Sequence, residues 1–221
     1  MKAKKIILAI LILLCAALIF TGCGDTEPAG TKDETTLDNG EQEKTKTEGT
    51  FVIELYPEYA PLTVENFVKL VSEGFYDGLT FHRIVNDFMA QGGGYDISGA
   101  KKPADSIYGE FANNGYTQNT LPHTKGVISM ARVSGMNNSA SSEFFIMYDF
   151  PRHATVLDGD YAAFGKVIDG MEVIDKLTEI ERTYNSGKEL AVPVNPVIIK
   201  KATILENTDG GNPKVQMEIE Y

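Results

Sequence analysis

Short apolar segments bounded by turn residues recur along the sequence from residue 50 onward, and they limit the possible folds more than any other feature. Residues 51–55 alternate, with Phe51, Ile53 and Leu55 on one face, which is typical of a half-buried strand. Other strand-like runs are bounded by Gly, Asn, Ser, Asp or Pro. These runs cover residues 79–84, 127–131, 144–147, 163–167 and 196–205.

Two segments have the apolar spacing of a helix. The first begins at Pro61, a residue suited to the first helical turn, and extends to Gly74, which suits a C-terminal stop. The second covers residues 171–180. Because short strands greatly outnumber helices, the pattern favours a mainly β fold, either an antiparallel barrel or a sandwich.

The composition agrees with a folded domain and argues against one class of partner. Hydrophobic residues make up 43% of the 221 residues and charged residues 23%, which is close to the globular average and excludes wholesale disorder. The chain carries 31 acidic and 20 basic side chains, for a formal net charge of −11. Polyanions are normally recruited by a basic surface, so we expect no nucleic-acid partner.

Residues 1–22 have the layout of an export signal. Lys2, Lys4 and Lys5 precede an uninterrupted apolar run over residues 6–20. This run is shorter than the roughly 20 residues that a transmembrane helix needs. We therefore expect a cleaved signal peptide, and an uncleaved membrane anchor is the alternative.

Cys23 follows small residues at the end of the apolar run, an arrangement that resembles the lipobox of bacterial lipoproteins. The resemblance implies cleavage before Cys23 and acylation of its side chain, although Phe20 stands where leucine is commoner. Two or more acyl chains would anchor the protein stably, whereas one is marginal. Cys15 would leave with the signal, so no intramolecular disulfide could form. We expect a lipid-anchored protein on the extracytoplasmic face of a bacterial cell membrane.

Residues 23–49 are predicted to form a lipidated cysteine followed by a disordered acidic tether. From residue 24 to residue 49 there are eight acidic side chains, three lysines, one large aliphatic residue and no aromatic residue. Such a stretch cannot bury enough apolar surface to offset the entropy of ordering. A folded domain then covers residues 50–206, and residues 207–221 form a C-terminal extension to which the sequence assigns no function.

Residues 81–93, with the sequence FHRIVNDFMAQGG, resemble the signature segment of the cyclophilins, the cyclosporin-binding class of peptidyl-prolyl isomerases. Supporting blocks follow in the family's order, in parts of residues 54–67, 106–111, 126–131, 142–146 and 157–167. The resemblance covers residues 50–206. It implies a closed eight-stranded antiparallel barrel capped by two α-helices, with the active groove on the outer face, and we expect a monomer.

Prolyl isomerisation needs no nucleophile and no cofactor. Rotation about a peptide bond costs about 18–20 kcal/mol because the C–N bond has double-bond character. The two X–Pro ground states nevertheless differ by only about 0.5–1 kcal/mol. A catalyst therefore needs a pocket for the proline ring and a group that prefers the twisted amide. A guanidinium can donate N–H groups to the lone pair that the prolyl nitrogen regains, and it does so without titrating.

The resemblance assigns these roles to particular residues. Arg83 matches the family's catalytic arginine, and the walls of the proline pocket would be Phe88, Met89, Phe145 and Leu157. Ordinary core packing is the alternative for the four apolar residues.

Three further positions match residues that contact the substrate backbone in the family. Gln91 would hydrogen-bond the substrate and orient Arg83. Ala131 and Arg132 match positions where the family's backbone pairs with an extended peptide. Phe144, next to the pocket residue Phe145, should face the core because adjacent strand residues point in opposite directions.

Three residues depart from the family pattern. Glu143 stands where glutamine is frequent, so its carboxylate would lie near the groove, where it could bias the site for the residue before proline or pair with Arg83. Val156 stands where cyclosporin-sensitive members carry tryptophan, so we expect weak cyclosporin binding. Tyr161 replaces a histidine that many members carry, and it still offers a hydroxyl and a ring edge to a substrate.

We expect no metal site, because His82, His123 and His153 lack metal-ligand spacing. The function predicted from the sequence is a peptidyl-prolyl cis-trans isomerase that acts without a cofactor. It would bind proline-containing polypeptides and accelerate the folding of exported proteins, in which X–Pro isomerisation can limit the rate. The alternative is a non-catalytic peptide-binding or chaperone module that uses the same groove.

Overall fold

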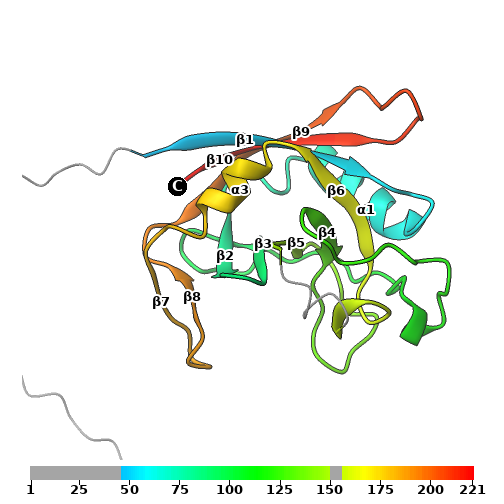
Figure 1. The fold of residues 1–221 in the computed structure, drawn as a ribbon, viewed down its shortest axis with the longest axis horizontal. Coiled ribbons are helices and arrows are strands. Elements are labelled where there is room, and N and C mark those ends of the chain that lie inside the picture. Colours follow the sequence, from blue (N-terminus) through cyan, green and yellow to red (C-terminus); the bar gives the residue numbers. More distant parts are fainter. Residues whose placement is uncertain (1–45, 150–155) are drawn as a thin grey trace, which may run out of the picture. The chain divides into compact units, whose positions relative to one another are not determined.

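Eight strands close into an antiparallel barrel in the computed structural model, which describes residues 46–149 and 156–221. Around the barrel the order is β1-β10-β9-β2-β3-β5-β4-β6, and β6 pairs with β1 to complete the ring. The predicted mainly β fold with a closed eight-stranded barrel is confirmed (Figure 1). The strands are β1 Glu48–Leu55, β2 Leu79–Val85, β3 Met89–Asp96, β4 Val127–Met130, β5 Phe144–Met147, β6 Ala163–Asp169, β9 Val197–Leu205 and β10 Lys214–Glu220.

The predicted signal peptide, the lipidation site Cys23 and the tether up to residue 45 lie outside the described residues, and so does His153. Within residues 46–149 and 156–221, no helix is long and apolar enough to cross a membrane.

Helix α1, Pro61–Ser72, begins at the proline that the sequence marks as its first residue. Its N-cap residue, Ala60, provides no side-chain cap. The carboxylate of the fully buried Glu110 takes this role from a distant part of the chain, because it accepts hydrogen bonds from the backbone N–H groups of Leu62 and Thr63 at 3.0 and 2.8 Å. A negative group at a helix N-terminus satisfies unpaired N–H groups and favours the helix dipole.

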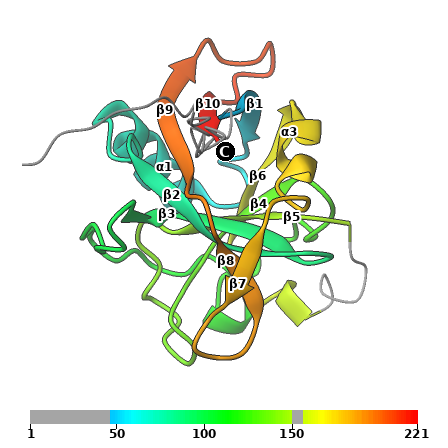
Figure 2. The same cartoon turned by 90° about the vertical axis from the view of Figure 1, so that its left-hand side faces the viewer.

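Helix α3, Met171–Lys176, is the second helix that the sequence predicts. The two helices lie on opposite sides of the barrel in Figures 1 and 2, and both contribute apolar side chains to one core, which confirms the capping by two helices. A 3₁₀ turn, η1, covers Ala112–Asn114. A separate two-stranded hairpin, β7 Arg182–Tyr184 and β8 Leu190–Pro193, lies beside β2 (Figure 2).

The buried side chains form two clusters on the two faces of the barrel wall. The larger cluster fills the interior and includes Phe81, Phe144 and Ile146. The smaller cluster includes Met89 and Phe145, which alternate with interior residues along β3 and β5. The prediction that Phe144 faces the core, with Phe145 on the other face, is therefore confirmed.

Strand β10 lies within residues 207–221, which were expected to form an extension beyond the folded domain. In the structure it is a full member of the barrel, hydrogen-bonded to β1 on one side and to β9 on the other. Val215, Met217 and Ile219 point into the core and are almost completely buried. The barrel thus includes a strand beyond residue 206, and the alternating pattern of these three residues is the signal that identifies it.

Candidate active site

Arg83 reaches the outer face of the barrel because β2 carries a bulge. Strict alternation would place Phe81 and Arg83 on the same face of the strand. These two residues pair with consecutive residues of β3, however, so that His82 is an extra residue in β2. Phe81 and Ile84 are consequently buried in the core, while His82 and Arg83 are both partly exposed. Bulges of this kind redirect side chains next to active sites.

A cavity of about 140 Å³ lies over the outer face of the wall beside Arg83. All of the residues that line it were predicted from the sequence as catalytic or substrate-binding residues. They are Arg83, Phe88, Met89, Gln91, Ala131, Arg132, Phe145, Leu157 and Tyr161. The structure therefore brings together residues from several strands and loops at one site, and we call this cavity the groove.

The groove is apolar at its base. Met89, Phe145 and Leu157 are each less than a tenth exposed and belong to the smaller hydrophobic cluster, against which Phe88 and Tyr161 pack. The rings of Phe145 and Tyr161 meet edge to face, with their centroids 5.8 Å apart. Such a base can contact a small aliphatic ring without requiring a polar partner.

The guanidinium of Arg83 lies at the edge of this apolar base. Its Nη1 donates to Oε1 of Gln91 at 3.1 Å and lies 3.8 Å from the sulfur of Met89, and its central carbon is 5.7 Å from the ring centroid of Phe88. Its Nε and Nη2 donate to the two carboxylate oxygens of Glu189, each at 2.7 Å. The contact with Gln91 agrees with the expected orienting role, whereas Glu189 was not predicted as a site residue.

Arg132 is the second arginine that lines the groove. Its guanidinium lies over the ring of Tyr161, 4.7 Å from the centroid, and its Nε donates to the carbonyl of Asp160 at 3.0 Å. The backbone N–H of Ala131 is already used inside the barrel, since it donates to the carbonyl of Glu143 at 2.9 Å. Pairing between an extended peptide and these two residues stays a prediction.

Glu143 lies next to the groove, behind the side chain of Gln91. In the described part of the chain it does not line the groove, and its carboxylate does not pair with Arg83. It accepts instead from Nε2 of Gln91 at 3.0 Å and from Nζ of Lys101 at 2.9 Å, and it lies 3.6 Å from Nε2 of His82. The amide of Gln91 thus stands between Glu143 and Arg83, so Glu143 can act on the groove through Gln91.

His82 is the neighbour of Arg83 on β2, and its surroundings favour the neutral imidazole. Burial lowers its pKa below the ordinary value of 6.5, and the nearby carboxylate of Glu143 opposes this effect. Val156, which precedes Leu157, is exposed. The weak cyclosporin binding that this valine implies stays a prediction.

Ser129, His123 and Asp158 form a hydrogen-bonded series that has the residue types of a nucleophilic triad. The distances are 2.8 Å from Nδ1 of His123 to Asp158 and 3.0 Å from Nε2 to the hydroxyl of Ser129. Ser129 is fully buried and His123 is only 2% exposed, so this hydroxyl cannot reach a substrate. The imidazole stacks on the ring of Phe145, and the series therefore supports the base of the groove. No cluster of metal-ligating side chains occurs among the described residues.

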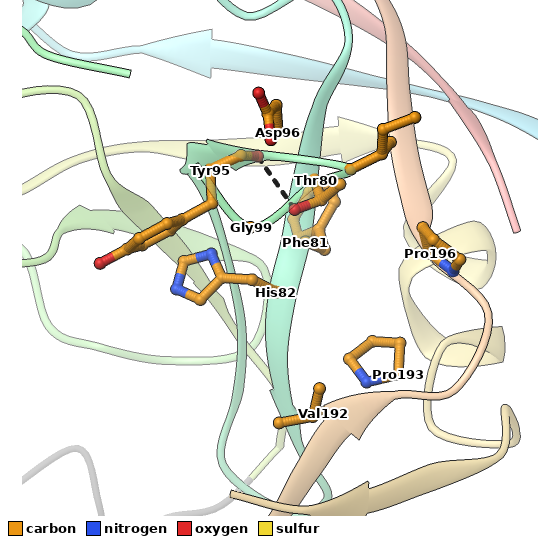
Figure 3. Close-up of a pocket in the computed structure, with 10 residues that line it drawn as sticks. Thr80, Phe81, His82, Tyr95, Asp96, Gly99, Val192, Pro193 and Pro196 are labelled. Carbon is orange, nitrogen blue, oxygen red and sulfur yellow. Dashed lines mark hydrogen bonds between the residues drawn. The ribbon is translucent and has the colours of Figure 1, made fainter. Parts of the chain in front are cut away.

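A larger cavity, of about 260 Å³, lies over the first half of β2 and is shown in Figure 3. It is lined mainly by apolar side chains, with Val192 and Pro193 of β8 and Pro196 on one side and His82 and Tyr95 on the other (Figure 3). Because this cavity contains no arginine, we assign the chemistry to the smaller groove beside Arg83.

Comparison with known proteins places the chain in one family. The family described as "Cyclophilin type peptidyl-prolyl cis-trans isomerase/CLD" matches residues 42–204. The chain is 39% identical over 165 residues to peptidyl-prolyl cis-trans isomerase A of Dickeya dadantii, which covers 73% of this chain and 83% of that protein. It is 37% identical over 163 residues to peptidyl-prolyl cis-trans isomerase B of Escherichia coli, which covers 72% of this chain and 95% of that protein.

A solved structure supports the same assignment. The cyclophilin-type isomerase of Cryptosporidium parvum, crystallised in the presence of the dipeptide Ala-Pro, aligns with a TM-score of 0.54 and 27% identity. The alignment covers 72% of this chain and 99% of that chain. The protein therefore belongs to the cyclophilin-type peptidyl-prolyl cis-trans isomerases.

Proposed function

We propose that this isomerase binds the proline ring of an X–Pro segment against Phe88, Met89, Phe145 and Leu157, while Arg83 donates an N–H group to the prolyl nitrogen of the twisted amide. The observation that carries the proposal is the position of the Arg83 guanidinium at the edge of a cavity whose base is apolar. Apolar contact with this base would hold the ring, and the guanidinium at its edge would donate to the ring nitrogen.

The free energy needed to accelerate prolyl rotation is of a size that Arg83 and the apolar base can supply. Acceleration from roughly 0.01 to roughly 1,000 turnovers per second corresponds to about 7 kcal/mol of preferential binding of the transition state. A planar amide nitrogen is a poor acceptor, whereas a twisted amide nitrogen carries a localised lone pair. The hydrogen bond from Arg83 therefore strengthens as the bond rotates, which is the differential interaction that catalysis requires.

We propose proline-containing polypeptides as the substrates, and among them proteins that fold after export. The first part is supported by the related Cryptosporidium parvum isomerase, which was crystallised in the presence of the dipeptide Ala-Pro. The sequence of residues 1–23 supports the second, since an export signal followed by Cys23 would place the domain outside the cytoplasmic membrane on a lipid anchor.

A refolding experiment tests the role of Arg83. A protein whose refolding is limited by an X–Pro bond is refolded with the purified wild type, with Arg83→Ala and with Arg83→Lys. We expect a large loss of acceleration for Arg83→Ala and a smaller loss for Arg83→Lys, which keeps the charge and loses the planar donor geometry. Equal acceleration by wild type and Arg83→Ala would contradict the proposal and favour a groove that only binds peptides.

A further inference from the structure

Glu189, which lies outside the barrel, forms an ion pair with the Arg83 guanidinium. Its carboxylate accepts from Nε and Nη2, each at 2.7 Å. A bidentate pair of this kind fixes the plane of a guanidinium as well as its position. Glu189 lies 106 residues after Arg83 and belongs to the loop between β7 and β8, so it is brought to the groove by the hairpin alone.

Some N–H groups of the Arg83 guanidinium remain available to a substrate. An arginine side chain has five N–H groups. Glu189 accepts from Nε and from Nη2, and Gln91 accepts from Nη1. The other Nη1 hydrogen has the sulfur of Met89, a weak acceptor, at 3.8 Å. The strong hydrogen bonds thus occupy Nε, one hydrogen of Nη2 and one hydrogen of Nη1. The second hydrogen of Nη2 and the weakly bound second hydrogen of Nη1 are left for a prolyl nitrogen.

The loop that carries Glu189 is built to hold its carboxylate. Nδ2 of Asn185 donates to Oε2 of Glu189 at 3.1 Å. Oδ1 of Asn185 accepts from the backbone N–H groups of Gly187 and Glu189, at 2.9 and 3.0 Å. Lys188, between them, adopts a φ of +62°, a conformation that costs energy for a residue other than glycine. One asparagine therefore shapes the turn and orients the carboxylate at the same time.

The hairpin is also tied to the strand that carries Arg83. Arg182, the first residue of β7, donates from Nη1 to the carbonyl of Ile84 at 3.3 Å and to the side chain of Asn86. Its Nη2 donates to the carbonyl of Thr178 at 3.0 Å. The base of the hairpin is therefore hydrogen-bonded to the end of β2, which supports the position of Glu189 beside Arg83.

Stability does not explain this pair. The side chains of Arg83 and Glu189 are 30% and 32% exposed, and ion pairs as exposed as these contribute little to folding. Two effects on catalysis then compete. The carboxylate offsets part of the positive charge of Arg83, but it also prevents the side chain from sampling other rotamers. The prolyl nitrogen is an uncharged acceptor whose hydrogen bond depends steeply on direction, so orientation outweighs net charge.

We propose that Glu189 is a positioning residue that holds the Arg83 guanidinium in the plane needed to reach the prolyl nitrogen. The inference rests on the proposed role of Arg83. It extends that role to a hairpin outside the barrel, so that the donor is already ordered when the substrate arrives.

The test is Glu189→Gln, which keeps the length of the side chain and loses its charge and its second strong acceptor oxygen. With an Ala-Pro-containing peptide as the probe, we expect kcat to fall by about tenfold, because small errors in donor position are costly. KM and the melting temperature should be unchanged. The control is Glu206→Gln, the same substitution at an exposed glutamate that follows β9. A kcat for Glu189→Gln equal to that of the wild type and the control would overturn the proposal.

A double mutant separates this proposal from the proposed function. If Glu189 acts through Arg83, adding Glu189→Gln to Arg83→Ala should not lower the residual activity further. A further drop by the same factor as in the wild type would show that Glu189 acts by another route, and would overturn the positioning role. Full activity of Arg83→Ala would refute the proposed function instead. Asn185→Ala, which leaves the Glu189 carboxylate present but less constrained, should lower kcat by a smaller factor, and an unchanged kcat would again contradict the proposal.

Discussion

The buried imidazole of His123 supports the groove although it contacts no substrate. It joins Asp158, next to the pocket residue Leu157, to Ser129 on β4, and it stacks on Phe145 with an interplanar angle of 15°. Burial lowers the pKa of His123 below its ordinary value of 6.5, and the hydrogen bond to Asp158 opposes this effect. The folded protein therefore favours a neutral imidazole at this position.

This preference predicts how stability depends on pH. A histidine whose pKa is lower in the folded state binds fewer protons there than in the unfolded chain, so the free energy of unfolding should fall as pH drops below about 6.5. His82, whose pKa burial also lowers, contributes in the same direction. Urea unfolding at about pH 7.5 and about pH 5.5 measures the loss.

Substitution of His123 gives the matching control. His123→Phe keeps a ring against Phe145 but leaves the hydroxyl of buried Ser129 without its partner, so it should cost about 1–3 kcal/mol at neutral pH. It should also reduce the loss of stability between the two pH values. A wild type whose stability is the same at both, or a variant with an unchanged pH dependence, would contradict this account.

The sequence located most of the groove but not the residues that hold it in place. One short motif places Arg83 on β2, Phe88 in the following turn, and Met89 and Gln91 on β3, and its resemblance to the family was sufficient to identify them. Glu189 has no such signal, because its position depends on the angle at which a hairpin meets the barrel. The sequence left open whether Glu143 pairs with Arg83, since the pairing of a carboxylate depends on which of several nearby cations lies within reach, and in the structure that cation is Lys101.

At the scale of elements, β10 completes a barrel that the matched family segment leaves open. The family match ends at residue 204, whereas β10 covers Lys214–Glu220 and bridges β1 and β9. The last residue, Tyr221, exchanges backbone hydrogen bonds with Thr47 at 2.8 and 2.9 Å, so the C-terminus lies beside the start of the barrel. Glu220 also pairs with Lys46 and Lys200.

Removal of residues 207–221 should therefore prevent folding rather than shorten a tail. Burial of Val215, Met217 and Ile219 contributes about 1.5–3 kcal/mol each, a sum comparable to the total stability of a domain. The deletion would also expose the edges of β1 and β9, which favours aggregation. The measurement is cooperative urea unfolding of the truncated chain. A transition at the wild-type midpoint would show that β10 is dispensable.

For helix α1, the first residue could be predicted from the local sequence, whereas the residue that caps it could not. The start of α1 could be predicted from Pro61, because the preference of proline for the first turn is local. Its cap could not, since Glu110 is distant in sequence and resembles an ordinary surface glutamate until the fold buries it beside Thr63. For β10 the alternation was present in the sequence, and the strand was missed because it falls outside the resemblance to the family.

The proposed location of the whole molecule at the cell membrane depends on acylation of Cys23. If the signal is cleaved and Cys23 is acylated, wild-type protein expressed in a bacterium should sediment with membranes, and Cys23→Ala should be released into the soluble extracytoplasmic fraction. Mass spectrometry of the mature N-terminus should detect a diacylated cysteine. A soluble wild type, or an unmodified N-terminus that retains residues 1–22, would rule out the lipid anchor without affecting the assignment of the enzyme.

The role of Arg83 as the group that accelerates prolyl rotation is the central claim, and exchange spectroscopy tests it most directly. An Ala-Pro-containing peptide is observed by NMR in the presence of wild type or Arg83→Ala, and the cis–trans exchange rate and the peptide affinity are measured in the same sample. We predict that Arg83→Ala still binds the peptide in the apolar groove, while the exchange rate of the bound peptide falls by at least about a hundredfold. Exchange as fast as in the wild type, at equal occupancy of the groove, would contradict the account.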